Sequence, residues 1–275
     1  MIAVKEMRNH GISLNKSLSF SGVSKAKWYY TKKPRNISLN SGIVQSVQKM
    51  SASRPTYGTR RMAATLSRKL GRPVNRKQIQ RIFHKLGWIE PAKTKNEIIR
   101  SNKKILKPTA PNQLWQTDMT YLWCGIDGWC YLFNAVDVFT RKWVGYSFDV
   151  SATKDAAVQC VVNAITSEKP DASKLTIRTD NGSQYISKKF RESITILGAR
   201  QEFIYHHTPE QNGHIESFHH TLKKEYVWPH EFANYQDAEI VIANAYSDYN
   251  NSRIHSALGY TTPNEFAKSW EMRNK

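Results

Sequence analysis

The sequence predicts an all-α region at the N-terminus followed by a larger α/β region. Charge divides the chain at the same place: residues 1–110 hold 25 Lys and Arg against 3 acidic residues, whereas residues 111–275 hold 16 against 19. Apolar residues at helical spacing fill the first region, and aromatic, β-branched runs begin near residue 114. At 275 residues and 40% apolar side chains, the chain is long enough for one large domain with a small companion.

Composition excludes several classes of protein. The sequence has no run of about 18 apolar residues, and residues 1–10 lack the apolar stretch of a signal peptide, so we expect a cytoplasmic protein without a membrane partner. Cys124, Cys130 and Cys160 form no CxxC pair, which favours three reduced, mostly buried thiols over a zinc site. The net charge of +19 and the pI near 9.8 instead indicate a polyanionic partner.

Residues 59–88, TRRMAATLSRKLGRPVNRKQIQRIFHKLGW, show a helix-turn-helix pattern. The first helix has apolar residues spaced for one buried face: Met62, Ala63, Leu66 and Leu70. Gly71 suits the position after this helix, and Asn75 is expected to cap the second helix in a capping box with Gln78. The second helix has its own apolar stripe: Ile79, Ile82, Phe83 and Leu86. Its outward positions carry side chains that suit phosphates and base edges: Arg76, Lys77, Gln80, Arg81, His84 and Lys85.

A weaker pattern of the same kind lies in residues 13–33, where Gly22 separates two short helical stretches and Ser24 is placed to cap the second. Such helices are often no more than solvated basic faces. The turn, the caps and the concentrated charge together favour DNA binding by residues 1–90. Residues 91–113, rich in Lys, Asn and Pro, are expected to form a basic linker, and residues 114–275 the second domain.

The second domain begins with three runs typical of consecutive antiparallel strands, at residues 114–123, 128–140 and 142–150. A helix at 153–166, a strand at 174–179, a helix at 187–198 and a strand at 200–205 follow, and then long helices from residue 213. A three-stranded meander followed by alternating helices and strands describes a ribonuclease H-like α/β domain.

Three acids of this domain are placed to converge. Asp118 lies in the first strand and Asp180 at the end of the fourth, and these two strands are expected to be neighbours; Glu216 lies in the helix after residue 213. Carboxylates that lie so close together repel one another unless a cation neutralises them. Carboxylate oxygens are the ligands that Mg²⁺ and Mn²⁺ prefer. Each acid alone suits an ordinary role in a turn, a helix end or a strand edge. The 35 residues between Asp180 and Glu216 favour a shared site.

The segments WQTDMTYL, TDNGSQYIS and NGHIESFHHTLKKE resemble the three signature blocks of the integrase catalytic core, shared by retroviral integrases and bacterial insertion-sequence transposases. In those proteins Asp, Asp and, 35 residues later, Glu form the DDE triad. The resemblance is strongest to the OrfB product of the insertion-sequence-three (IS-three) family. It extends to the helix-turn-helix segment and to YNNSRIHSALGYTTPNEF near the C-terminus. In place of an acid frequent in that family, this chain has Gln211, and neither a zinc-binding HHCC module nor a heptad zipper is present in the sequence.

The resemblance implies a DNA transposase in which Asp118, Asp180 and Glu216 bind two Mg²⁺ (or Mn²⁺) ions, cut the element's end and join the released 3′-hydroxyl to target DNA. It also implies that Lys223, two helical turns after Glu216, contacts a phosphate near the scissile bond, with Lys224 pointing elsewhere. Implied partners are double-stranded DNA (terminal repeats and target), further copies of the chain on that DNA, and the upstream-frame OrfA product, in a bacterial, nucleoid-associated setting. Two other readings remain: a metal-dependent nuclease without joining activity, and a DNA-binding regulator with an inactive core.

Overall fold

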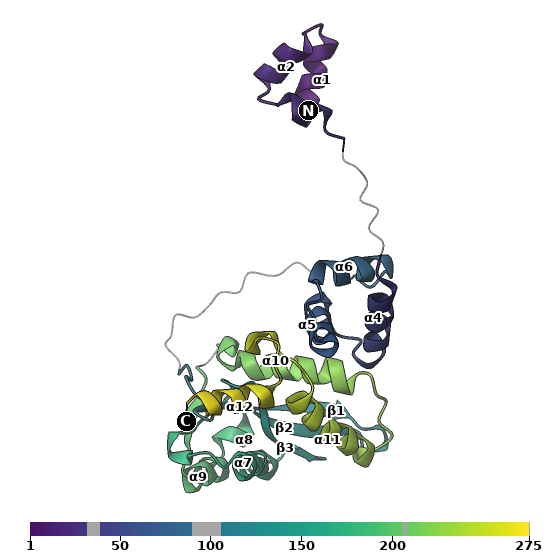
Figure 1. Cartoon of the computed structure of the whole chain (residues 1–275). Coiled ribbons are helices and arrows are strands. Elements are labelled where there is room, and N and C mark those ends of the chain that lie inside the picture. The colour runs from purple at the N-terminus through teal and green to yellow at the C-terminus, as the bar shows by residue number, and fades with distance from the viewer. Residues whose placement is uncertain (32–38, 90–105, 206–207, 275) are drawn as a thin grey trace. The chain divides into compact units, whose positions relative to one another are not determined.

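The computed structural model describes residues 1–31, 39–89, 106–205 and 208–274, and these residues form two compact units, Met1–Asn40 and Ser41–Lys275 (Figure 1). The first unit contains three short helices: α1 (Ile2–Asn9), α2 (Leu14–Phe20) and α3 (Lys25–Tyr29). The predicted cap of α3 is present, because the Ser24 hydroxyl accepts a hydrogen bond from the backbone N–H of Lys27 at 3.2 Å. Gly22, at φ +62°, makes the turn between α2 and α3.

The second unit begins with a helical group: α4 (Ser41–Ser53), α5 (Thr59–Leu70) and α6 (Arg76–Lys85). The predicted turn is confirmed, with Gly71 in the left-handed conformation at the end of α5. The capping box is not formed: the Asn75 side chain accepts from the N–H of Lys77 at 2.8 Å rather than from that of Gln78. Leu70, expected in the buried face, is 39% exposed and is the last residue of α5.

A five-stranded mixed sheet forms the centre of the unit: β1 (Leu114–Trp123), β2 (Trp129–Asp137), β3 (Trp143–Asp149), β4 (Thr176–Thr179) and β5 (Arg200–Phe203). The strand order is β3-β2-β1-β4-β5, with antiparallel pairs in the predicted meander and parallel pairs from β1 to β4 and β4 to β5. The predicted adjacency of the first and fourth strands is therefore confirmed. Cys124 and Cys130 flank the β1–β2 turn, and like Cys160 both are buried and unpaired.

Helices cover both faces of the sheet (Figure 1). One face packs against α7 (Lys154–Glu168), α8 (Ser183–Ile186) and α9 (Lys188–Ile196) around a core that includes Trp115 and Phe133. The other packs against α10 (Gly213–Leu222) and α11 (Tyr235–Asn251) around Trp143 and Phe218. Helix α12 (Pro263–Arg273) packs on α11. Short turns complete the chain: η1 (Gly125–Asp127), η2 (Ala172–Lys174), η3 (Pro209–Asn212), π-helical η4 (Lys223–Val227) and η5 (Ser256–Leu258).

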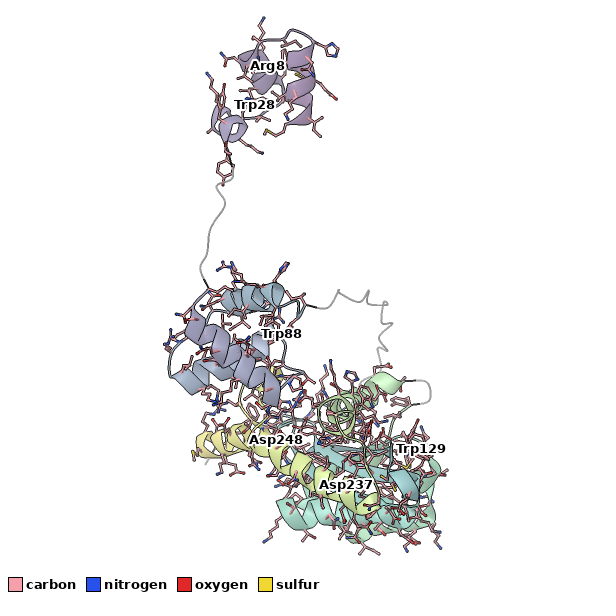
Figure 2. The ribbon with its side chains drawn as sticks, turned by 90° about the vertical axis from the view of Figure 1, so that its right-hand side faces the viewer. Arg8, Trp28, Trp88, Trp129, Asp237 and Asp248 are labelled. Atoms are coloured by element: carbon pink, nitrogen blue, oxygen red, sulfur yellow. The ribbon has the colours of Figure 1, made fainter. Side chains whose placement is uncertain are left out.

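Ion pairs join the helical group to the sheet-containing part, and both belong to the second unit, which begins at Ser41. The pairs are Arg54–Asp248, Arg61–Glu225 and Arg68–Glu265, at 2.5, 3.1 and 2.5 Å. Asp248 lies on α11, as Figure 2 shows, and receives both terminal nitrogens of Arg54. The predicted linker 91–113 lies mostly outside the described residues. Within the described ranges, no helix is long and apolar enough to cross a membrane.

Candidate active site

Asp118 on β1 lies near Asp180, the residue that follows β4, and the charge of Asp180 acts on it. The strands pair Leu114 with Thr176 and Gln116 with Arg178. The same register, continued by two residues, places Asp118 beside Asp180. The Asp180 carboxylate accepts the backbone N–H of Gly182 at 2.9 Å, so the residues after it turn away into α8. A Cβ on Gly182 would lie 3.0 Å from that carboxylate oxygen, so a larger residue here would crowd Asp180.

Gln116 positions the helix that carries Glu216. Its side-chain nitrogen donates to the carbonyl of Gln211 at 2.7 Å, and its side-chain oxygen accepts from the N–H of Ile215 at 3.0 Å. A buried side chain two residues before Asp118 therefore holds the residue before Glu216. Gln211, the departure from the family's acid, is itself buried, and its side chain accepts the N–H of Tyr205 at 3.0 Å.

Electrostatics link the three acids. The pKa of Asp118 is raised from 3.8 to about 7, first by burial, then by the charge of Asp180 and to a smaller extent by that of Glu216. One hydrogen bond opposes this shift, from the backbone N–H of Met119 to the Asp118 carboxylate at 2.8 Å. Burial and the charge of Glu210 also raise the pKa of Glu216. Asp118 is thus the centre of an arrangement with excess negative charge.

His219 and Asn134 belong to this site but were absent from the sequence prediction. Asn134 lies directly opposite Asp118 in the β1–β2 register, and its side-chain nitrogen lies 3.0 Å from Nε2 of His219. With Asn134 as donor, His219 carries its proton on Nδ1, which lies 3.6 Å from the Asp118 carboxylate. Burial lowers the pKa of His219 to about 3, so the ring is neutral. The available signal was spacing, because His219 follows Glu216 by three residues on one helix face.

The three acids do not form one cluster around a single point. Within the described residues, no three His, Cys, Asp or Glu side chains are close enough together to hold one metal ion. The electrostatic coupling instead runs from Asp118 to Asp180 and from Asp118 to Glu216. All the donors are hard carboxylate oxygens, and the pKa of Asp118 is raised first by burial and then by the charges of Asp180 and Glu216, a combination that a bound cation would offset. The donor chemistry of these residues therefore suits a divalent cation.

Lys223 begins the π-helical turn η4 instead of continuing α10, so its orientation is set by that turn. Its ammonium lies 4.7 Å from the ring centre of Tyr121 on β1, and its charge helps to lower the pKa of His219. Lys223 therefore lies on the side of α10 that faces β1. Lys224 points elsewhere, into a pocket of about 710 Å³ that it shares with Gln80 and Trp88 of the helical group.

The six predicted DNA-contacting side chains of α6 are all exposed, whereas Ile79, Ile82 and Phe83 are buried. The exposed set is Arg76, Lys77, Gln80, Arg81, His84 and Lys85. The helix thus presents one basic face away from its apolar stripe.

Comparison with known proteins identifies both parts. An integrase core domain family matches residues 108–209 and a second one residues 197–263, and an HTH-like domain family matches residues 43–96. The transposase for insertion sequence element IS904 of Lactococcus lactis subsp. lactis (strain IL1403) is 34% identical over 60% of this chain and 65% of its own length. The insertion element IS600 uncharacterized 31 kDa protein of Shigella sonnei is 31% identical over 79% of this chain and 84% of its own length.

A solved structure shares the fold. The simian T-cell lymphotropic virus intasome in complex with PP2A regulatory subunit B56 gamma contains a chain that matches 81% of this one at 18% identity, with a TM-score of 0.51 and 74% of that chain covered. Retroviral integrase cores have the ribonuclease H-like fold, in agreement with the prediction. Given these matches, the chain belongs to the insertion-sequence transposases with a helix-turn-helix region and an integrase core, the OrfB type of the IS-three family.

Proposed function

We propose that this protein is a DNA transposase that cuts the ends of an insertion sequence and joins them to target DNA, with Asp118, Asp180 and Glu216 as the catalytic, metal-binding residues. The observation that supports it most is the raised pKa of Asp118, caused by burial together with two further carboxylates that an integrase core would use. The family assignment supports the reaction class, and the pairing of acids around Asp118 supports divalent metal.

In this proposal each residue has a distinct task. Asp118, Asp180 and Glu216 would hold two divalent cations, Mg²⁺ or Mn²⁺, which would supply charge stabilisation to phosphoryl transfer. Gln116 fixes the start of α10 and with it the reach of Glu216. Neutral His219, oriented by Asn134, places its Nδ1 3.6 Å from the Asp118 carboxylate, so a polar N–H faces that carboxylate beyond direct hydrogen-bond distance.

We further propose that α6 reads the element's terminal repeats and that the first unit adds a second basic contact. Several copies of the chain assemble on the DNA, and the OrfA product joins them. The ion pairs from α5 to Glu225 and Glu265 support joint DNA binding by α6 and the catalytic part, because they tie the helical group that carries α6 to the catalytic part of the same chain.

A strand-transfer assay tests the proposal. The full chain is incubated with Mg²⁺, a labelled duplex of the element's end and a target plasmid. Labelled end joined to plasmid supports transposition. Shortened duplex without joined product would leave only a nuclease, and DNA binding without either product would leave only a regulator.

Replacing Arg76 and Arg81 together by Ala in the full chain should weaken binding of the terminal repeat by at least about 10-fold. It should also lower the salt slope, which is the slope of the logarithm of the binding constant against the logarithm of the salt concentration, by about two, because each lost phosphate contact lowers this slope by about one. Lys174→Ala with Lys188→Ala, which removes two exposed charges from the catalytic part, is the matched control. Fluorescence anisotropy over a salt series measures both. Equal losses in the two double variants would contradict DNA reading by α6.

Lys223→Ala should slow cleavage about 10-fold or more and weaken end binding while leaving metal binding unchanged, because its ammonium lies on the face of α10 that looks toward β1. Lys224→Ala should slow cleavage far less, because that side chain faces the helical group. Single-turnover cleavage at saturating protein separates the chemical step from binding. If both variants cleave at one rate, Lys223 is not a contact near the scissile phosphate.

A further inference from the structure

A second, basic pocket of about 270 Å³ lies beside α10. Three arginines from separate parts of the chain line it: Arg61 of α5, Arg141 of the β2–β3 hairpin and Arg253 after α11. None of the three belongs to the proposed active site or to the exposed face of α6.

The pocket and the acids lie on different flanks of α10. His214, Ser217 and Thr221 line the pocket at spacings of three and four residues. Glu216 and His219 repeat the spacing of three. At about 100° per residue, the two sets project on opposite sides of the buried stripe of the helix. DNA that crosses the outer surface of α10 would therefore reach both flanks.

The pocket holds more positive than negative charge. Arg61 and Arg253 share one carboxylate, that of Glu225, at 3.1 Å for Arg61 and at 2.8 and 2.9 Å for Arg253. Arg141 has no ion pair with any described residue, and its guanidinium contacts Nδ1 of His214. Three guanidinium groups thus lie near two carboxylates, that of Glu225 and that of Asp137, whose charge acts on Arg141, and this leaves an excess of one positive charge.

The backbone holds Arg141 in place, although its conformation is uncommon for a residue other than glycine, at φ +61°. Its N–H donates to the carbonyl of Asp137 at 2.9 Å. The Asp137 carboxylate is occupied elsewhere, by the N–H groups of Asn112 and Thr140 at 2.7 and 2.6 Å. Asp137 therefore acts on Arg141 through its charge, while its carboxylate oxygens are bonded to other groups.

Neutral donors complete the lining. The pocket is also lined by the hydroxyls of Ser217, Thr221 and Ser256, which make no hydrogen bond to another side chain or backbone group among the residues that the structure describes. Guanidinium groups beside free hydroxyls suit a phosphate, whose oxygens accept from both and which arginine binds through two parallel hydrogen bonds.

From these features we propose that the pocket binds a phosphodiester group of the DNA backbone, within one helical turn of the phosphate that is cut. The proposal rests on the proposed function and extends it, because it adds a DNA contact on the flank of α10 away from the acids. Arg141 is its main ligand, since Arg61 and Arg253 already share a carboxylate.

The test combines two kinds of change. Duplexes of the element's end carry a neutral methylphosphonate at one backbone position at a time, within about 10 base pairs of the cleavage site. Their affinities are measured for the wild type, Arg141→Gln, Arg141→Lys and Arg191→Gln, the last of which removes an exposed charge from α9 as the control. Thermal unfolding of each variant with and without inorganic phosphate checks its folding and free-phosphate binding.

We expect the wild type to lose affinity at one or two backbone positions. Arg141→Gln should bind unmodified DNA about 10- to 100-fold more weakly than the wild type, with a salt slope smaller by about one. A methylphosphonate at those positions should not weaken its binding further. Arg141→Lys should keep the slope, and Arg191→Gln should match the wild type.

An unchanged slope and an unchanged position profile in Arg141→Gln would overturn the proposal. Stabilisation by inorganic phosphate without any position effect would also overturn it, in favour of a free-anion site. Failure of the proposed function looks different, because the wild type itself would then neither cut nor join the duplex.

Discussion

Asp118→Asn, Asp180→Asn and Glu216→Gln should each reduce cleavage and joining by at least about 10³-fold while the fold stays intact. An amide keeps the shape of a carboxylate but loses the charge that binds a divalent cation, and phosphoryl transfer depends on that charge stabilisation. Single-turnover cleavage of the element's end in Mg²⁺ measures the loss, and circular dichroism checks the fold.

The control for this series is Asp171→Asn, an exposed acid that caps η2 and whose capping role an asparagine can keep. It should cleave at the wild-type rate. Any triad variant that cuts as fast as this control would remove its residue from the site.

Without metal, Asp118→Asn should make the protein more stable at pH 8. The pKa of Asp118 is raised from 3.8 to about 7, so the folded state holds this proton more tightly than the unfolded state does. The free energy of unfolding therefore falls as the pH rises from about 4 to 7, and the whole penalty, on the order of a few kcal/mol, is present above pH 7. Asparagine carries no such charge, so its Tm should exceed that of the wild type by roughly 5–10 °C at pH 8 and match it near pH 4.

Bound Mg²⁺ should reverse the order of the two Tm values, so that the wild type becomes more stable than Asp118→Asn. Mg²⁺ at millimolar concentration should raise the Tm of the wild type at pH 8, less at pH 5.5, where protons compete for Asp118, and hardly at all in Asp118→Asn. Calorimetry at three pH values, with and without Mg²⁺, provides the data. A difference in Tm that is the same at pH 4 and pH 8 would show that Asp118 is not buried among like charges.

Much of the fold was predictable because its signals are local. The aromatic, β-branched composition of the run that begins at Leu114 predicts a strand, the turn at Gly71 ends a helix, and Ser24 caps one, all from interactions within a few residues. Details that depend on competing local bonds were less predictable. The Asn75 side chain bonds to Lys77 rather than to Gln78, and Lys223 begins a π-helical turn.

The candidate site was predictable only in part. The three acids could be proposed from their spacing and from the resemblance, but not their relative protonation. The raised pKa of Asp118 comes from burial beneath α10 and from a neighbouring strand, and neither is visible in a sequence window. His219 and Asn134 were missed for the same reason, since they meet across 85 residues of chain.

By itself, the sequence determined which segments form helices and strands, where positive charge is concentrated, and which acids are candidates for metal. Tertiary structure alone decided three things. The β1–β4 register sets Asp118 beside Asp180. Three ion pairs hold the helical group against the catalytic part. Arg141 comes to lie in a pocket with Arg61 and Arg253. The physical reason is common to all three. Secondary structure follows from neighbouring residues, whereas the pairing of strands, the docking of helices and the convergence of side chains depend on closing long loops. Only the packed core selects which distant groups meet.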